Sequence, residues 1–194
     1  MQKSVLKLSR LMAVIGGVVL TLLILLTCLS VLGRSLNTIL HMSWVENLLG
    51  SMAQTLLDTG VGPITGDFEL VEAGMGFAIF AFLPLCQISG GHASVDIFTS
   101  HLSKRINRVI LTVGEVLFAF AMILIAWKLY DGMLGKMRYN ETTYLLQFPV
   151  WWAYGLSLIA AVVALIVALY VAVVRVAEAV TGRAILTTIG GAGQ

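Results

Sequence analysis

The 27 residues from Phe148 to Val174, FPVWWAYGLSLIAAVVALIVALYVAVV, contain no charged side chain. A helix of about 20 apolar residues is long enough to cross the hydrocarbon core of a bilayer. In that core no water is available to the backbone, so every N–H and C=O group must find a partner within the protein. The length and composition of this stretch therefore predict a transmembrane α-helix.

Three further stretches have the same character. Leu11–Leu32 and Ala73–Gly91 are uncharged, and Val109–Tyr130 carries only Glu115 and Lys128. The chain of 194 residues is 11% charged, whereas an average soluble domain is about 25% charged. No internal repeat or low-complexity linker divides it. We expect an all-α integral membrane protein that forms one domain over 1–194, with transmembrane helices at about 11–33, 69–90, 109–130 and 148–175.

The first stretch could instead be a cleaved signal peptide, because Lys3, Lys7 and Arg10 precede it. However, its apolar run is longer than the roughly 7–15 residues of a signal sequence, and no small-residue cleavage pattern follows. We therefore expect a retained helix.

Lysine and arginine residues are distributed unevenly between the connecting segments. Eight of the 12 precede the first span, separate the second from the third, or follow the fourth; the other four lie in or beside the two remaining connectors. An excess of Lys and Arg in short loops marks the cytoplasmic side of a membrane. Both termini are therefore predicted to be cytoplasmic.

The first periplasmic connector, 35–65, contains an amphipathic pattern. Apolar residues recur there at helical spacing, and polar residues occupy the other side. This pattern is typical of a helix that lies in the membrane interface, where a tryptophan ring is half solvated. We predict an interfacial helix in contact with membrane lipid, formed by Trp44, Val45, Leu48, Leu49, Met52 and Leu56.

Glu115 is the best candidate for a functional ionisable residue inside a span. A charge at the bilayer centre costs about 2.5–3.5 kcal/mol or more, so such residues are functional candidates by default. A small proton- or cation-coupled exporter would need such a carboxylate for coupling. The structural alternative is a carboxyl group hydrogen-bonded to a neighbouring helix or a partner subunit. We favour it, because a lone carboxylate without a second coordinating group is a weak ion site.

Acidic residues also open the second span. Glu69 and Glu72 lie where the helix dipole favours negative charge. Arg34 closes the first span on the same side of the membrane. A salt bridge between Arg34 and one of these glutamates is the more specific interpretation.

The three histidines do not form a common site, because His41 lies in a periplasmic connector and His92 and His101 lie in the cytoplasmic one. His92 and Asp96 are four residues apart and would be neighbours around the first turn of a short helix. We expect them to order that turn. No catalytic, cofactor or metal-binding motif accompanies them, so no enzyme activity, cofactor or metal site is expected. No segment could bind a nucleotide, and nucleic acid is not an expected partner.

Several short motifs follow one another along roughly residues 10–175. They are GR at 33–34, G-x-x-E-L at 66–70, F-L-P at 82–84, H-x-x-V-D at 92–96, L-S-K-R at 102–105 and L-x-x-P-x-W at 146–151. In order, spacing and topology the chain resembles the small membrane subunit, of DctQ type, of the tripartite ATP-independent periplasmic (TRAP) transporters. The 35–65 connector is longer than in many members, and Ala93 replaces the usual aliphatic residue after the histidine.

The resemblance implies a non-catalytic role in the bacterial inner (cytoplasmic) membrane. In such transporters a periplasmic substrate-binding protein captures an organic acid, typically a carboxylate taken up with sodium. A large multi-span membrane subunit holds the substrate and sodium sites, and the small subunit is its scaffold.

The same resemblance implies structural roles for the candidate residues. Arg34, Glu69 and Glu72 would stabilise the periplasmic ends of the first two spans, and Glu115 would face protein. The alternatives from other functional classes are a stand-alone exporter coupled through Glu115 and the membrane anchor of a respiratory enzyme.

Overall fold

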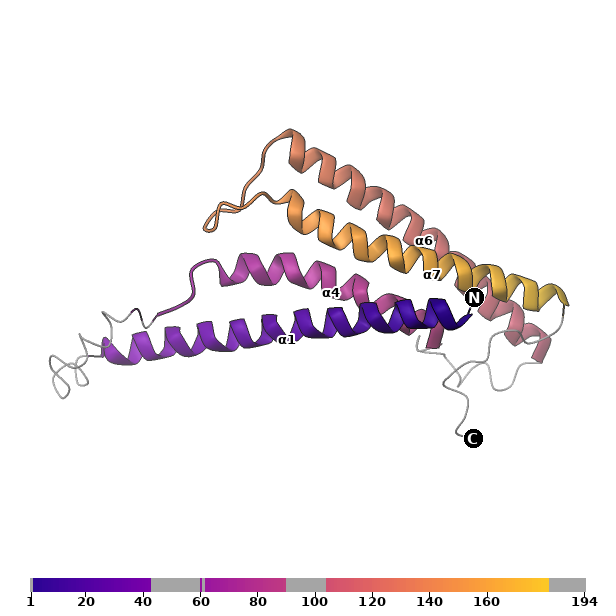
Figure 1. Cartoon of the computed structure of the whole chain (residues 1–194), viewed down its shortest axis with the longest axis horizontal. Coiled ribbons are helices and arrows are strands. Elements are labelled where there is room, and N and C mark those ends of the chain that lie inside the picture. Colours follow the sequence, from indigo (N-terminus) through magenta and orange to yellow (C-terminus); the bar gives the residue numbers. More distant parts are fainter. Residues whose placement is uncertain (1, 43–59, 61, 90–103, 182–194) are drawn as a thin grey trace.

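The structure is a computed structural model and describes residues 2–42, 60, 62–89 and 104–181. Its helices are α1 (Gln2–Leu40), α4 (Asp67–Ser89), α6 (Lys104–Arg138) and α7 (Trp151–Thr181), shown in Figure 1. Within these described residues, four helices are long and apolar enough to cross a membrane. No strand occurs in this part of the chain, only an isolated bridge between Thr142 and Pro149. The expected all-α class with four spans is confirmed.

The helices extend beyond the predicted spans at most ends. α1 continues to Leu40, so Ser35–Leu40 belong to a helix and not to the first connector, and α6 continues past Tyr130 to Arg138. The spans were predicted from uncharged residues, whereas a helix continues through the polar interface for as long as its backbone hydrogen bonds persist. The 39 residues of α1 reach about 58 Å at 1.5 Å per residue.

The last helix begins later than its apolar stretch. α7 starts at Trp151 and not at Phe148, because the preceding residues pair with the chain that follows α6. The N–H of Val150 donates to the carbonyl of Glu141 at 3.0 Å, and the N–H of Thr143 donates to the carbonyl of Phe148 at 3.0 Å. This loop therefore closes as a short hairpin over the ends of α6 and α7.

The helices form two antiparallel pairs, α1 with α4 and α6 with α7, and α4 joins the pairs by packing on α7 (Figure 1). We call the end of the bundle where α1 stops and α4 starts the Arg34 end, and the opposite end the Arg175 end. The N-terminal end of α1 and the C-terminal end of α7 both lie at the Arg175 end. The pairs approach one another there and diverge toward the Arg34 end (Figure 1).

Small side chains allow the helices to meet closely. Ala81 of α4 and Ala160 of α7 are fully buried and form a cluster with Met12 of α1. A Cβ atom on Gly16 of α1 would lie only 2.8 Å from the Cβ of Ala81. Because lipid tails are as apolar as side chains, helix association in membranes depends on such close packing. By contrast, the apolar side chains on the outer faces of α1 and α6 are largely exposed.

Some expectations fall on residues that the structure does not describe. The interfacial helix of Trp44, Val45, Leu48, Leu49, Met52 and Leu56 lies within 43–59, and His92 and Asp96 lie within 90–103, both outside the described residues. The cytoplasmic location of both termini rests on charge alone and stays a prediction.

Replacing Ala160 with leucine should destabilise the bundle. The larger side chain has no space between α4 and α7, and overpacking of this kind costs about 1–3 kcal/mol. Ala121→Leu is the matched control, because Ala121 is exposed on α6. Unfolding of both variants in detergent micelles, followed by circular dichroism, measures the difference. Equal stability of the two variants would contradict the packing described above.

Candidate functional site

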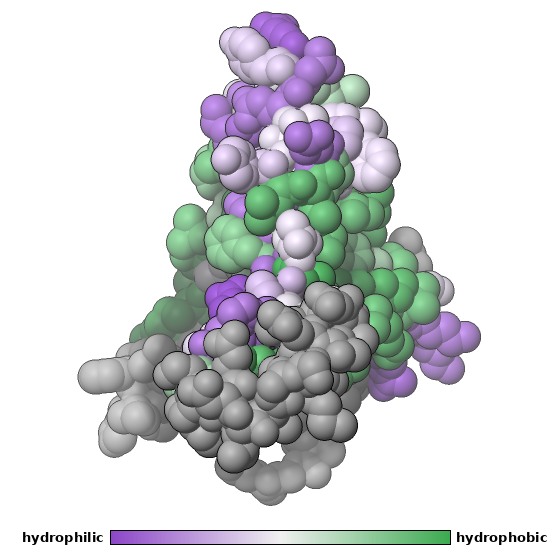
Figure 2. Space-filling view, turned by 90° about the vertical axis from the view of Figure 1, so that its left-hand side faces the viewer, coloured by the Kyte–Doolittle hydropathy of each residue, from purple (hydrophilic) through white to green (hydrophobic). Residues whose placement is uncertain are grey.

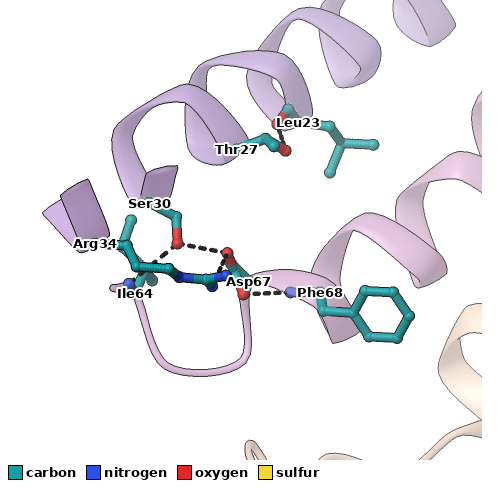
Figure 3. Close-up of polar contacts among 7 residues, drawn as sticks. All are labelled: Leu23, Thr27, Ser30, Arg34, Ile64, Asp67 and Phe68. Carbon is teal, nitrogen blue, oxygen red and sulfur yellow. Dashed lines mark hydrogen bonds and ion pairs between the residues drawn. The ribbon is translucent and has the colours of Figure 1, made fainter. Parts of the chain in front are cut away.

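A buried hydroxyl connects α1 with the start of α4 at the Arg34 end (Figure 3). Ser30 of α1 is fully buried and donates a hydrogen bond to the Oδ2 atom of Asp67. It also accepts one from the backbone N–H of Ile64 at 3.3 Å. The other carboxylate oxygen of Asp67 accepts from the N–H of Phe68 at 2.7 Å. Asp67 therefore holds the first turn of α4 against α1.

Arg34 pairs with this same carboxylate. Its Nη2 atom lies 3.9 Å from the Oδ2 atom of Asp67. The ion pair of Arg34 with Glu69 or Glu72, the more specific of the two interpretations of these acids, is therefore wrong: the partner is Asp67. The Arg34 side chain is 64% exposed, and exposed ion pairs contribute about 0–1 kcal/mol. The buried Ser30 hydroxyl is consequently the stronger part of this joint.

Glu69 connects α4 with the other helix pair. Its two carboxylate oxygens accept hydrogen bonds from the backbone N–H groups of Leu145, at 2.6 Å, and Leu146, at 2.9 Å. These donors belong to the loop between α6 and α7. Glu69 lies two residues after Asp67, about 200° around the helix, so one acid faces α1 and the other faces the loop. The predicted stabilising role of Glu69 thus has a concrete partner that sequence reasoning did not identify.

Glycines allow the backbone to approach at the same end. Gly66 has a φ angle of +79°, and a Cβ atom there would overlap the side chain of Leu146. A Cβ atom on Gly33 would overlap the backbone of Gly62. The motifs at 33–34, 66–70 and 146–151, far apart in the sequence, therefore meet at the Arg34 end.

The α6–α7 loop is stabilised by contacts of its own. The Nζ atom of Lys136 lies 2.5 Å from the Oε2 atom of Glu141. Asn140 and Gln147 have positive φ angles of 47° and 52°. Figure 2 views the bundle from the Arg34 end. Hydrophilic residues gather at the top of this view, where the loop lies, and apolar surface lies below them.

Glu115 lies on the side of α6 that meets another helix. The Nε2 atom of Gln87 in α4, whose residue is 2% exposed, donates a hydrogen bond to the Oε2 atom of Glu115. Glu115 itself is half-buried. This is the hydrogen bond to a neighbouring helix that was favoured over an ion-coupling role. It joins α4 to α6, although these helices do not pack along their lengths.

A second polar joint lies near the C-terminal end of α7. The Nη1 atom of Arg175 lies 3.0 Å from the Oε2 atom of Glu178, and Glu178 is 5% exposed. The Thr112 hydroxyl of α6 donates to the backbone carbonyl of Arg175 at 3.4 Å. Sequence reasoning treated Arg175 only as a topology signal. The spacing of three residues between a base and an acid on a helix was the available clue to the pair.

A cavity of about 630 Å³ occupies the space where the helix pairs diverge. Its walls come from α4, the end of α6, the α6–α7 loop and the start of α7, and include Glu69, Glu72, Leu129, Phe148, Tyr154 and Ser157. Glu72, the remaining predicted acid, is exposed and lines this cavity. The structure thus brings Arg34, Glu69 and Glu72 to one end of the bundle and places Glu115 on α6, in contact with α4.

No group of three or more His, Cys, Asp or Glu side chains that could hold a metal ion occurs among the described residues. Asp67, Glu69 and Glu115 instead bind a neighbouring helix or loop. The fold and these joints define an all-helical, multi-pass membrane protein whose polar side chains largely hold its helices together.

The family follows from comparison with known proteins. The family model described as the DctQ component of tripartite ATP-independent periplasmic transporters matches residues 23–179. The chain therefore belongs to the DctQ family, the small membrane component of TRAP transporters, and the resemblance in its motifs is confirmed. No curated protein and no solved structure matches it.

Removing the Ser30 hydroxyl should weaken the joint between α1 and α4. Ser30→Ala leaves the Ile64 N–H without its partner and the Oδ2 atom of Asp67 with only the Arg34 ion pair, and we expect this loss to cost about 1–3 kcal/mol. Thr27→Val is the matched control, because the exposed Thr27 hydroxyl only bonds to the Leu23 carbonyl of its own helix. Reversible unfolding in mixed micelles gives both free energies. A loss for Ser30→Ala no larger than that for the control would contradict the joint.

Removing the Glu69 carboxylate should release the α6–α7 loop. Charge-assisted hydrogen bonds are worth about 1.5–3 kcal/mol, so in Glu69→Ala the amides of Leu145 and Leu146 should exchange with deuterium about tenfold faster or more. Hydrogen-exchange mass spectrometry of the 144–150 peptide measures this. Glu72→Ala removes an acid one turn along the same helix and should leave that peptide unchanged. Unchanged exchange in Glu69→Ala would show that the loop is held by other contacts.

Proposed function

We propose that this chain is the scaffold subunit of a TRAP transporter in the bacterial inner membrane. In this proposal it holds the static part of the large membrane subunit during uptake of a carboxylate. The uptake is driven by sodium and supplied by a periplasmic binding protein. Family membership supports the tripartite assembly in general, and the sodium ions and the substrate are assigned to the large subunit.

The observation that carries the proposal is the use of polar side chains inside the bundle. Ser30 with Asp67, Gln87 with Glu115, and Arg175 with Glu178 all form contacts within the protein. Polar side chains engaged in this way fix helices in place. Together with the exposed apolar faces of α1 and α6, they favour a rigid element that packs beside lipid and a membrane partner.

The charge distribution supports an orientation for this scaffold. The connectors with the larger number of Lys and Arg residues lie at the Arg175 end, and that end is proposed to face the cytoplasm. The Arg34 end, with its cavity and loop, would then face the periplasm, from which the binding protein delivers its substrate.

Co-purification tests the scaffold role. The tagged chain, extracted from native membranes in mild detergent, should bring with it a stoichiometric, much larger multi-span protein that mass spectrometry identifies. In proteoliposomes that contain this partner and the binding protein, uptake from a panel of radiolabelled carboxylates should require the chain and an inward sodium gradient. A chain that emerges alone or as a homodimer would overturn the proposal.

A stand-alone exporter coupled through Glu115 is the second candidate. Proteoliposomes that contain the chain with its partners, and others that contain the chain alone, distinguish the two candidates. In Glu115→Gln the side chain can still accept the hydrogen bond from Gln87 but cannot titrate. A scaffold should therefore retain wild-type uptake in the three-component system. Transport by this chain alone, abolished in Glu115→Gln without loss of folding, would establish the exporter instead.

A further inference from the structure

The cavity at the Arg34 end is shaped by the divergence of two helices. The hydrogen bond from Gln87 to Glu115 brings α4 to α6 at one level of the bundle. Farther toward the Arg34 end, Glu72 of α4, Leu129 of α6 and Tyr154 of α7 all line the cavity. The cavity therefore lies among helices that diverge toward the Arg34 end, and we call it the wedge.

The cavity is lined by acids without a base. Its lining is otherwise apolar, aromatic or hydroxyl-bearing, and contains two glutamates and no Lys or Arg. Glu69 is engaged by the amides of Leu145 and Leu146. Glu72 has no hydrogen-bond or ion-pair partner among the described residues, and its side chain is exposed within a mainly apolar lining. No cation among the described lining residues neutralises Glu72, so a cation from outside the chain would complement this surface.

The same chemistry selects between possible occupants. Every phospholipid, whether anionic or zwitterionic, would bring a phosphate group next to two carboxylates, and no Lys or Arg among the described lining residues offsets that repulsion. A lysine or arginine side chain brings a cation and an apolar stem together, which matches both the acid and the walls. The aromatic ring of Tyr154 in the lining adds a favourable surface for a cation. The observations therefore favour a protein partner.

We propose that this wedge is a docking socket for a segment of the large membrane subunit. The segment carries a lysine or arginine that pairs with Glu72, flanked by apolar side chains that fill the space against Phe148 and Tyr154. The proposal rests on the proposed scaffold role and adds the place and the chemistry of the contact. It also assigns a role to Glu72 that the contacts within the chain leave open.

The first test compares two neutralised acids at the same end of the bundle. Glu72→Gln keeps the size of the side chain but removes its charge. Removing one member of a charge pair buried at an interface weakens binding because the other charge is left unpaired, so recovery of the large subunit with the tagged chain should fall by about tenfold or more. Asp131→Asn removes an exposed acid of α6 outside the cavity and should leave recovery unchanged. Equal recovery with the wild-type chain and Glu72→Gln would overturn the socket.

A photo-crosslink identifies what occupies the wedge. Phe148, in the lining, is replaced by p-benzoylphenylalanine, and Phe120, exposed on α6 outside the lining, is replaced in the control. Irradiation of intact membranes should join position 148 to a peptide of the large subunit with a lysine or arginine near the crosslink. Reversing the charge at both positions, with Glu72→Lys and an acid in the partner, should restore recovery. Crosslinks to lipid alone would overturn the socket.

The two proposals fail in different ways. If the wild-type chain brings no large subunit, the scaffold role itself is wrong. If the wild-type chain and Glu72→Gln bring it equally and position 148 reacts only with lipid, the scaffold role stands and the socket is wrong. Purified Glu72→Gln should show the wild-type helical content by circular dichroism, which separates loss of docking from loss of folding.

Discussion

The close approach of α4 to α7 is the constraint on which the rest of the structure depends. α1 reaches the other helices mainly through α4, and α6 reaches them mainly through α7. Ala81 and Ala160 are fully buried where these helices meet, so the backbones lie close enough for dispersion forces to act without a hydrophobic driving force. Because this contact is limited to part of the helix length, the two pairs can diverge beyond it. The wedge at the Arg34 end is a direct result.

Polar contacts reinforce this arrangement toward both ends of the bundle. Asp67 and Glu69 leave the first turn of α4 in different directions, one toward Ser30 of α1 and the other toward the α6–α7 loop. Gln87 reaches Glu115 across the space between α4 and α6. In a low-dielectric surrounding an unpaired polar group is costly, so each of these pairs also specifies the register of its helices. Asp67, Glu69 and Glu115 therefore connect a helix with a neighbouring helix or loop.

The sequence was sufficient to predict the class of fold, because an uncharged run such as Phe148–Val174 has few stable forms in a membrane. It also placed Arg34, Glu69 and Glu72 at one end of the bundle, and the structure has all three at the Arg34 end. It could not predict their partners. Arg34 was assigned to the wrong acid because helix rotation decides whether Asp67 or Glu69 faces α1, and sequence spacing does not fix that rotation between different helices. Ser30 was missed because a serine in an apolar run shows its role only through the side chain opposite it.

The asymmetry between the two ends of the bundle suits a scaffold better than a transporter. A transport site would need polar groups at the bilayer midplane on helices that can change their arrangement. Here the polar joint between α4 and α6 ties the helices together, and the open wedge lies beyond it, where the α6–α7 loop is held by Glu69. An opening bordered by fixed elements keeps its shape when a partner binds. The entropy cost of ordering side chains and loops on association is therefore small. In the proposed scaffold role, a static surface of this kind is what a moving transport subunit would require from its neighbour.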